Sequence, residues 1–448
     1  MRFTQWTRGH IPEIAIFTLG VFLRLTMLWR YKPEWGYDGV GHLDYIAWIL
    51  QHGSLPPQDG DTRYHPPLYY VVAAGLVKAG LRNVTWLSVT CGVARLGLIW
   101  AGLEWYLKDR RARIAGLALA GILPSSIMVD GMVSNEAMSC MFATAAIILL
   151  PKAMEATGRR RWLFGVTLGF LFGLALLSKA SIFALFAPTG IGLALAALLP
   201  VKPIDWRSRL TPLLPWVAGA ALCFAISGWF YAQRAREYGS PFVTPYEMFP
   251  ERLHAAAKTP FLHRRSLGFV VGWDWGIYSM PYYPAGLPHF FPVILASTFT
   301  DYYNFSFAGI SEGDLTVNGR PLTTRLVWLA RGAVLGGNII FIATLCAWAI
   351  SLLKTVQRRD WGMFAVLLMP LLATALLLSF ATKYPYDAHG PIKAAYIHFG
   401  AAPLYAMFGL AAAWGLAKRN RWPVAGLLLI GLAAVAVYTL CCRTGLLL

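Results

Sequence analysis

The chain has 448 residues, of which 57% are hydrophobic and 13% are charged, and its formal net charge is +18. So little polar surface cannot cover a soluble globule, and apolar runs of roughly 20 residues, the length that crosses a bilayer, recur along the chain. The positive charge does not indicate nucleic acid as a partner, because Lys and Arg stand in short clusters between apolar runs, where they set membrane topology. The six cysteines form no CxxC pair, which argues against a disulfide framework or a zinc site.

The composition predicts an all-α polytopic membrane protein. The first apolar run, 11–29, follows Arg2 and Arg8, so the positive-inside bias places the N-terminus in the cytoplasm. This run is long enough to span and no small-residue cleavage site follows it, so we interpret it as a retained helix and not as a signal peptide. About eleven spans are expected, at 11–29, 86–107, 113–131, 134–151, 162–179, 181–200, 211–231, 332–353, 361–382, 395–416 and 423–441.

Basic clusters decide the one ambiguous segment. Hydropathy alone would let 66–81 cross the membrane, but a span there would put the cluster at 108–113 outside, against the bias. We therefore expect 66–81 to lie along the outer surface and the C-terminus to be outside. All the basic clusters then fall on the cytoplasmic side, at 108–113, 152–161, 201–209, 354–359 and 417–421.

This topology suggests three parts of the chain. An N-terminal membrane module, 1–231, contains a first external loop at 30–85; an external cap loop covers 232–331, and 332–448 adds the last spans. The cap loop is too apolar and aromatic to be disordered. Its aromatic residues either stack on a sugar or form the core of the cap itself, namely Trp273, Trp275, Tyr282 and Tyr283.

Three charged residues fall inside or at the edge of spans: Arg95, Glu136 and Lys179. A charge at membrane depth is expensive and is by default a functional hypothesis with a partner to be found. The alternative is structural: Arg95 pairs with a nearby carboxylate such as Glu136, and Lys179 extends its ammonium to the interface.

The first external loop gathers most of the polar chemistry, with five acids between positions 34 and 61. Asp38, His42 and Tyr45 are spaced i, i+4, i+7, so a helix over 39–50 would place them on or near one face. A carboxylate at the head of such a helix suits a general base for a hydroxyl or amine acceptor. Alternatively, Asp38 caps the helix by accepting backbone N–H bonds. Asp44 is expected to face water.

Two further places hold candidate ligands for a phosphate. His65 precedes two prolines in YHPPLYY, which alone is weak evidence for a site. A short loop before the next-to-last span carries His389, Lys393, Tyr396 and His398. Cations and phenols at that depth suit a lipid phosphate, and they equally suit anchoring among lipid headgroups.

An ordered series of segments resembles the GT-C superfamily of membrane glycosyltransferases: YDGVGHLDYIAWILQHGSLP, YHPPLYY, VARLGLIWAGL, MVSNEAM, GLALLSKAS and IKAAYIHFGAAPLYA. The nearest branch includes protein O-mannosyltransferases and the lipid A aminoarabinose transferase. The resemblance covers most of the first 190 residues and returns at 390–416. It implies a GT-C fold with surface-lying helices in the first loop, a lipid-phosphate-linked sugar donor and a catalytic first-loop aspartate on the outer face.

Carried over by position, the resemblance makes Asp38 the catalytic acid and gives His65 a place in the site. Asn135 and Glu136 match the polar pair that opens a span, and Lys179 matches the lysine that ends another. His42, Asp44 and Arg95 remain further active-site candidates.

Two departures from the family pattern matter. Many relatives have a second acid directly after the first, where this chain has Gly39, so assistance by a divalent metal is left open and no cofactor is assigned. The late motif has Ala395 where arginine is common, so the phosphate contact falls to Lys393 and Tyr396 or to Arg264 and Arg265 of the cap loop.

We therefore expect an inverting glycosyltransferase that moves a hexose or pentose from a polyprenyl (undecaprenyl-type) phosphate to a glycan, lipid or protein acceptor. The setting expected is the bacterial inner membrane, with a periplasmic active site. The alternative is a transporter or flippase of lipid-linked or small polar solutes, which should show inverted repeats that the sequence lacks.

Overall fold

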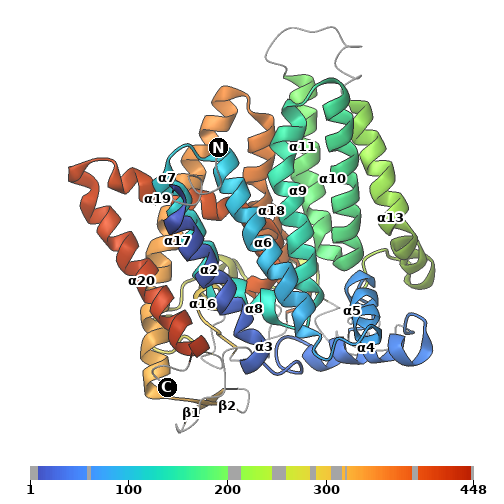
Figure 1. Ribbon diagram of the computed structural model, residues 1–448, viewed down its shortest axis with the longest axis horizontal. Coiled ribbons are helices and arrows are strands. Elements are labelled where there is room, and N and C mark those ends of the chain that lie inside the picture. The colour runs from blue at the N-terminus through green and yellow to red at the C-terminus, as the bar shows by residue number, and fades with distance from the viewer. Residues whose placement is uncertain are drawn as a thin grey trace.

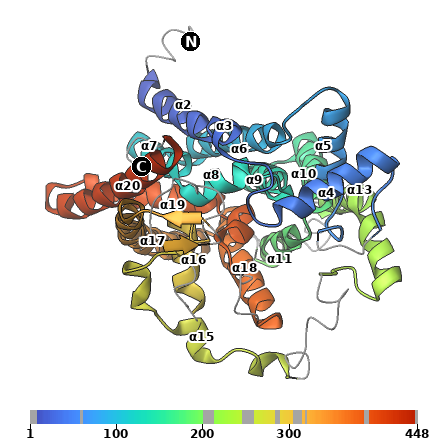
Figure 2. The ribbon, with the colours of Figure 1, turned by 90° about the horizontal axis from the view of Figure 1, so that it is seen from below.

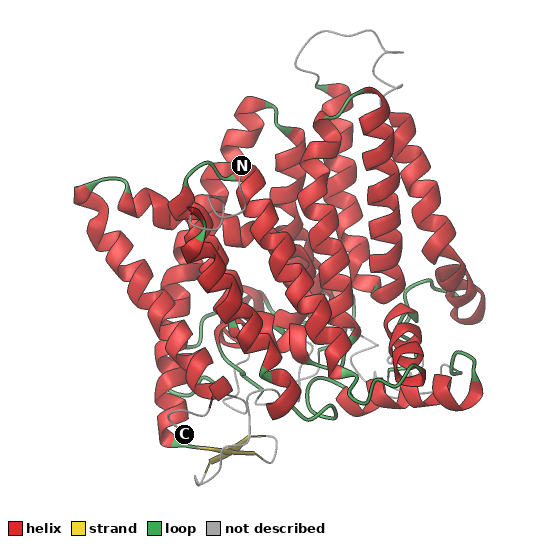
Figure 3. Ribbon diagram, viewed as in Figure 1, coloured by secondary structure: helices red, strands yellow, loops and turns green. Residues whose placement is uncertain are grey.

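The computed structural model describes residues 9–57, 62–199, 213–244, 259–282, 289–303, 315–317, 320–385 and 392–444. Within these ranges the chain is a bundle of long helices with shorter helices and loops at one end (Figure 3). A two-stranded hairpin at that end pairs β1 (Leu315–Val317) antiparallel with β2 (Arg320–Leu322). The predicted all-α membrane architecture is confirmed.

Nine helices of the described chain are long and apolar enough to cross a membrane. They comprise α2–α3 (Ile11–Arg30), α6 (Thr85–Tyr106), α9 (Asn135–Glu155), α10 (Gly158–Ser178), η1–α11 (Ala180–Leu198), α13 (Leu214–Tyr238), α17 (Thr324–Arg358), α18 (Trp361–Lys383) and η8–α20 (Arg419–Arg443). Two bent pairs also qualify, which gives eleven spans if each pair is counted as one, as predicted from the sequence.

The two bent spans have local causes. The chain turns by 55° between α7 (Arg110–Ile122) and α8 (Pro124–Gly131). Leu123 there is extended, because the residue before a proline avoids the helical region. The second bend is 83°, between the 3-10 helix η7 (Ala394–Gly400) and α19 (Ala402–Leu416).

The bundle has two chemically different ends. The ends of α6, α9, α17 and α19 carry the clusters 108–113, 152–161, 354–359 and 417–421 to one end, which we call the basic end and which is uppermost in Figure 1. The cluster at 201–209 lies outside the described residues. At the opposite end, α4 (Gly39–His52) lies across the ends of the spans, with α5 (Leu68–Lys78) beside it (Figure 2). We call this the site end.

The helix α5 does not cross the bundle. Its 11 residues rise about 16 Å, roughly half the hydrocarbon thickness. It packs on α4 through a separate apolar cluster that includes Tyr45, Tyr69 and Tyr70. The expectation that 66–81 does not span is thereby confirmed, and α4 begins at Gly39 as predicted.

Small residues allow α10 and α13 to approach very closely. Gly165, Gly169 and Gly173 recur every fourth residue along α10, the spacing that lines up one helix face. A Cβ added to Gly169 would lie 2.0 Å from the carbonyl oxygen of Gly219 on α13. These two helices form one wall of the membrane module.

The partner of Arg95 differs from the sequence expectation. Arg95 lies 2.9 Å from Oδ1 of Asp130, and the Arg24 guanidinium donates to Oδ2 of the same carboxylate at 2.7 Å. Ser126 accepts a further hydrogen bond from each arginine. The structural alternative, in which Arg95 pairs with a nearby carboxylate, is confirmed, but the partner is Asp130 and not Glu136, because the bend before α8 brings Asp130 against α6. All three ionic side chains are buried.

Candidate active site

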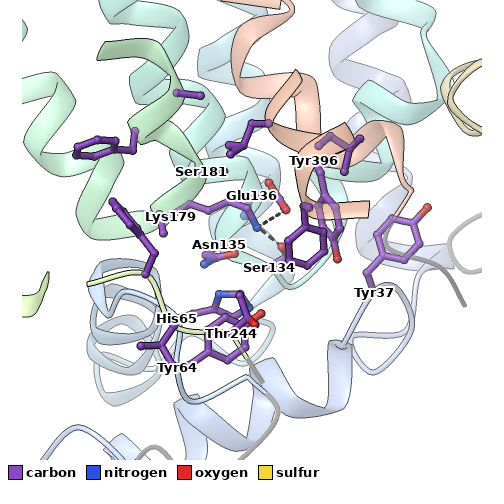
Figure 4. A pocket seen from close by; sticks show the side chains of 18 of the residues that line it. Tyr37, Tyr64, His65, Ser134, Asn135, Glu136, Lys179, Ser181, Thr244 and Tyr396 are labelled. Carbon is purple, nitrogen blue, oxygen red and sulfur yellow. Dashed lines mark hydrogen bonds and ion pairs between the residues drawn. The ribbon is translucent and has the colours of Figure 1, made fainter. Parts of the chain in front are cut away.

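A cavity of about 720 Å³ opens at the site end, where the first external loop meets the ends of several spans. One part of its lining is polar, and Figure 4 labels these side chains, apart from Asp38 and His42, where they converge from different elements. The polar lining consists of Tyr37, Asp38, His42, Tyr64, His65, Ser134, Asn135, Glu136, Lys179, Ser181, Thr244 and Tyr396. The remaining lining is apolar and is contributed chiefly by η1, α11 and α18.

Asp38 stands at the head of α4 with its carboxylate unengaged. Its backbone has φ 58°, a left-handed conformation that is uncommon outside glycine but is tolerated by Asp. The side chain makes no capping hydrogen bond, so the capping alternative is wrong. Among the described residues this exposed carboxylate has no hydrogen-bond or ion-pair partner. A non-glycine residue held in this conformation is characteristic of functional sites.

The glycine at the neighbouring position 39 is required for a steric reason. A Cβ at this position would lie 2.7 Å from the carbonyl oxygen of Glu34. The turn that presents Asp38 therefore leaves no room for a second acid directly after it. The departure from the family pattern follows from the backbone of this loop.

Two histidines line the cavity, His42 and His65, and burial lowers the pKa of each. A 2.8 Å hydrogen bond joins Nδ1 of His42 and the hydroxyl of Tyr70, and the rings of His42 and His65 stack at 5.6 Å. Burial lowers the pKa of His42 to about 4, although the nearby Asp38 carboxylate raises it. Burial, followed by the charge of Lys179, lowers the pKa of His65 well below its usual value.

An ion pair crosses the polar part of the cavity. Lys179 is the extended residue between α10 and η1, and its Nζ lies 2.5 Å from Oε1 of Glu136. The alternative in which Lys179 merely extends toward the interface is wrong, because its ammonium points to this carboxylate. Asn135 is fixed by donating from Nδ2 to the carbonyl of Ser178 at 2.8 Å.

A second ammonium lies behind the cavity wall. Lys393 does not line the cavity, but its Nζ is 4.3 Å from the ring centre of Tyr37 and 5.5 Å from that of Tyr396, both of which do. Tyr303 closes the cage at 5.9 Å. Burial lowers the pKa of Lys393, and the charge of Asp38 counters this. Among the described residues no carboxylate forms an ion pair with Lys393.

We call the apolar part of the cavity lining the apolar arm. Phe183 and Phe186 come from the η1–α11 segment, and Leu376, Leu377 and Phe380 come from the facing helix α18. Both elements are membrane spans, so the arm lies beside the lipid-facing part of the bundle. The cavity therefore combines a polar end with a hydrocarbon-lined end.

Several sequence candidates lie elsewhere. Asp44 faces water as expected, paired with Arg63 at 2.9 Å. Arg95 belongs to the buried cluster with Asp130, and His398 is buried against Ser125. Arg265 does not line the cavity; it donates to the carbonyl of Ala381, one residue beyond the lining Phe380.

The cap aromatics do not line the cavity either. Tyr282 is buried and hydrogen-bonded to Tyr438 of α20, so it packs as core, whereas Trp275 is exposed. Trp273 is half-buried, and Tyr283 and His389 lie outside the described residues.

The sequence interpretation missed several lining residues. Tyr37 and Tyr64 directly precede Asp38 and His65, so position next to a candidate was the available signal. Thr244 follows α13 and carries no such signal. Within the described ranges, no group of three or more His, Cys, Asp or Glu side chains is placed to hold a metal ion.

Comparison with known proteins shows what the chain resembles. Residues 64–231 match the family model of dolichyl-phosphate-mannose-protein mannosyltransferases. No curated protein sequence matches the chain significantly. The fold resembles Archaeoglobus fulgidus AglB, an oligosaccharyltransferase solved with an inhibitory peptide and a dolichol-phosphate, with a TM-score of 0.54 at 14% identity over 97% of this chain and 56% of that one.

A second structure, of the Archaeoglobus fulgidus oligosaccharyltransferase tethered to an acceptor peptide containing the NVT sequon, gives a TM-score of 0.56 at 14% identity over 98% of this chain and 56% of that one. The chain thus spans little more than half the length of these structures. The protein is an integral membrane protein with the GT-C fold. Residues 64–231 and the overall fold are therefore similar to those of GT-C membrane glycosyltransferases.

Proposed function

We propose that this protein transfers a sugar, with inversion, from a polyprenyl phosphate to an acceptor that binds beside Asp38. The observation that carries the proposal is the make-up of one cavity. It joins an unengaged carboxylate, two histidines and the Lys179–Glu136 ion pair to an apolar arm lined by phenylalanine and leucine. An amphiphilic donor fits this cavity, with its sugar and phosphate in the polar part and its hydrocarbon chain in the apolar part.

The chemistry is a single displacement at the anomeric carbon. The acceptor oxygen or nitrogen forms the new bond, the bond from the anomeric carbon to the phosphate oxygen breaks, and the polyprenyl phosphate leaves with the electron pair. Asp38 accepts the proton of the acceptor as the bond forms. One carboxylate suffices, because a phosphate leaving group needs no general acid, unlike the sugar oxygen that a glycoside hydrolase must protonate.

Cations hold the charge of the leaving phosphate. Lys179 lines the cavity, and Lys393 lies behind Tyr37 and Tyr396 with no carboxylate paired to it among the described residues. The first turn of α9, which begins at Asn135, adds backbone N–H groups and the positive end of its helix dipole. Such fixed positive groups stabilise the charge that develops in the transition state.

The topology supports an external site. If the basic end is cytoplasmic, as the positive-inside bias favours, the site end faces the opposite side of the membrane. In a bacterial inner membrane this is the periplasm. The apolar arm then lies in the outer leaflet, where a polyprenyl chain lies. The solved relative AglB was captured with a dolichol-phosphate, which supports a lipid-phosphate donor.

The decisive experiment compares two carboxylates of α4. Purified protein is given labelled polyprenyl phosphate sugars and extracted envelope acceptors, and transfer is measured for wild type, Asp38→Asn and Asp44→Asn. Loss of a general base lowers the rate about 100- to 10,000-fold, which we expect for Asp38→Asn. Asp44→Asn, outside the cavity on the same helix, should retain wild-type activity.

Each other outcome changes the proposal. Equal transfer by wild type and Asp38→Asn would remove Asp38 from the role of base. Retention of the donor's anomeric configuration in the product would rule out the single displacement. Transfer from none of the donors, combined with movement of labelled lipid-linked sugar across vesicles, would favour a flippase.

A further inference from the structure

A second cavity, of about 390 Å³, lies at the basic end, on the far side of the bundle from the candidate active site. It falls within the size range of pockets that bind small ligands, about 300–1,000 Å³. Its walls come from α6, α9, α17, α18 and α19. We call it the basic-end cavity.

The inner wall of the basic-end cavity is hydrocarbon. Ile99 and Leu103 of α6, Ile147 of α9 and Leu410 of α19 contribute it. Room is left because α19 presents the small side chains of Ala402 and Ala406 after the bend in its span. The hydroxyls of Tyr106 and Thr355, which also line the cavity, already donate to the backbone carbonyls of Ile148 and Leu352, so this wall offers a ligand mainly hydrocarbon.

The rim of the basic-end cavity is cationic. Lys354 and Arg358 stand four residues apart near the end of α17, so both lie on the same face of that helix. Both are exposed, and neither forms an ion pair or hydrogen bond within the described residues. Asp360 also lines the rim, but its Oδ1 already accepts the N–H of Met363 as the cap of α18. The rim therefore carries one net positive charge.

The depth of the basic-end cavity matches the layer where hydrocarbon meets headgroups. Its α6 and α9 residues belong to the last turns of two spans that end at Tyr106 and Glu155. Basic pockets between spans at this depth attract anionic lipid headgroups. A phosphodiester with one negative charge matches the rim, and acyl chain matches the wall.

We propose that the basic-end cavity binds one anionic glycerophospholipid, with its phosphate between Lys354 and Arg358 and an acyl chain against the α6–α19 wall. This site is independent of the proposed glycosyl transfer. By joining α17 to α6 and α19, the bound lipid stabilises the arrangement of the helices.

The test is native mass spectrometry of delipidated protein titrated with phosphatidylglycerol. Wild type should bind one molecule specifically. Each basic residue near an anionic lipid contributes about five-fold in affinity, so Lys354→Ala combined with Arg358→Ala should bind about 25-fold more weakly. The matched control, Arg159→Ala with Arg160→Ala, removes two exposed arginines at the same end of the bundle and should change affinity less than about two-fold.

A third variant tests the hydrocarbon wall without changing charge. Ala406→Phe should fill the basic-end cavity and abolish the specific binding event. If this variant does not fold, the charge variants still decide, because their side chains are exposed. Melting temperature gives a second readout: phosphatidylglycerol should raise that of wild type and leave that of the Lys354/Arg358 variant unchanged.

Three outcomes would overturn the proposal. An equal loss in the Arg159/Arg160 control would indicate general surface attraction in place of a site. Equal binding of phosphatidylethanolamine would show that the rim does not select an anionic headgroup. Displacement of phosphatidylglycerol by equimolar undecaprenyl phosphate would assign the basic-end cavity to an isoprenoid lipid.

Discussion

The ammonium of Lys179 and the carboxylate of Glu136 lie 2.5 Å apart in the candidate active site, with only 12% and 3% of their side chains exposed. Each therefore depends on the other for its charge. Removing one partner of a buried pair costs about 3–5 kcal/mol because the other charge remains unpaired.

This pair allows stability and activity to be separated. Lys179→Met should lower thermal stability, and adding Glu136→Gln should restore much of it, because no charge is then left alone. Glycosyl transfer should stay at least about 100-fold down in both variants, since the phosphate has lost a cation. Lys78→Met, which removes an exposed lysine of α5, is the control and should alter neither. Recovery of transfer in the double variant would show that Lys179 serves stability alone.

Because the backbone of Asp38 is left-handed, we expect that replacing it by glycine lowers activity without lowering stability. Asp38→Gly should abolish transfer while raising the melting temperature or leaving it unchanged, because glycine adopts a positive φ without strain. Asp38→Ala should lose transfer and also about 1 kcal/mol of stability. Thermal unfolding followed by tryptophan fluorescence measures both. A melting temperature lowered equally by glycine and alanine would contradict the strain.

The buried imidazole of His42 makes stability depend on pH. Its pKa is about 4 in the folded protein and 6.5 in the unfolded chain, so between these values only the unfolded chain binds the proton. Stability should therefore be full above pH 6.5 and fall as the pH is lowered toward 4, by at most about 3 kcal/mol.

Melting temperatures across that pH range provide the measurement. His42→Gln should flatten the slope, whereas His52→Gln, which changes an exposed histidine at the other end of α4, should leave it as in wild type. The same slope in wild type and His42→Gln would assign the dependence to other groups, His65 first.

The Arg24–Asp130–Arg95 cluster predicts unequal effects of its members. Asp130→Asn leaves two buried guanidinium groups without an anion and should reduce the yield of folded protein severely. Arg95→Met should be milder, because Arg24 still neutralises Asp130. Since Arg95 does not line the cavity, Arg95→Met should keep wild-type transfer per folded molecule. A selective loss of turnover in that variant would return Arg95 to the active site.

The membrane topology could be predicted because its signals are local. Each basic cluster fixes the side of its own loop, and parity then removed 66–81 from the spans, as α5 confirms. In contrast, no local signal predicts that Asp38 and Lys179 lie in one cavity. No spacing rule joins residues so far apart, and only the resemblance to a family indicated that they meet.

The partners of buried charges could not be predicted. The sequence indicated that the charges of Arg95 and Glu136 are costly at membrane depth. The observed partner of Arg95 is Asp130, which faces α6 because the chain bends at Leu123. Arg24 lies within the first apolar run, and the sequence interpretation did not single it out as a buried charge. The cage around Lys393 likewise uses Tyr303, which is remote in sequence and belongs to the segment before α17.

The length of α17 sets a distance between the membrane and the chain that precedes it. Its 35 residues rise about 52 Å, whereas the hydrocarbon layer is about 30 Å thick. Even at a tilt of 40°, the steep end of the usual range, about 10 Å of this helix must lie beyond the hydrocarbon layer. In Figure 1 it reaches beyond the other spans at the site end. The hairpin β1–β2, joined directly to the start of α17, is thus kept out of the hydrocarbon layer, and inserting one helical turn would move it about 5 Å along the helix axis.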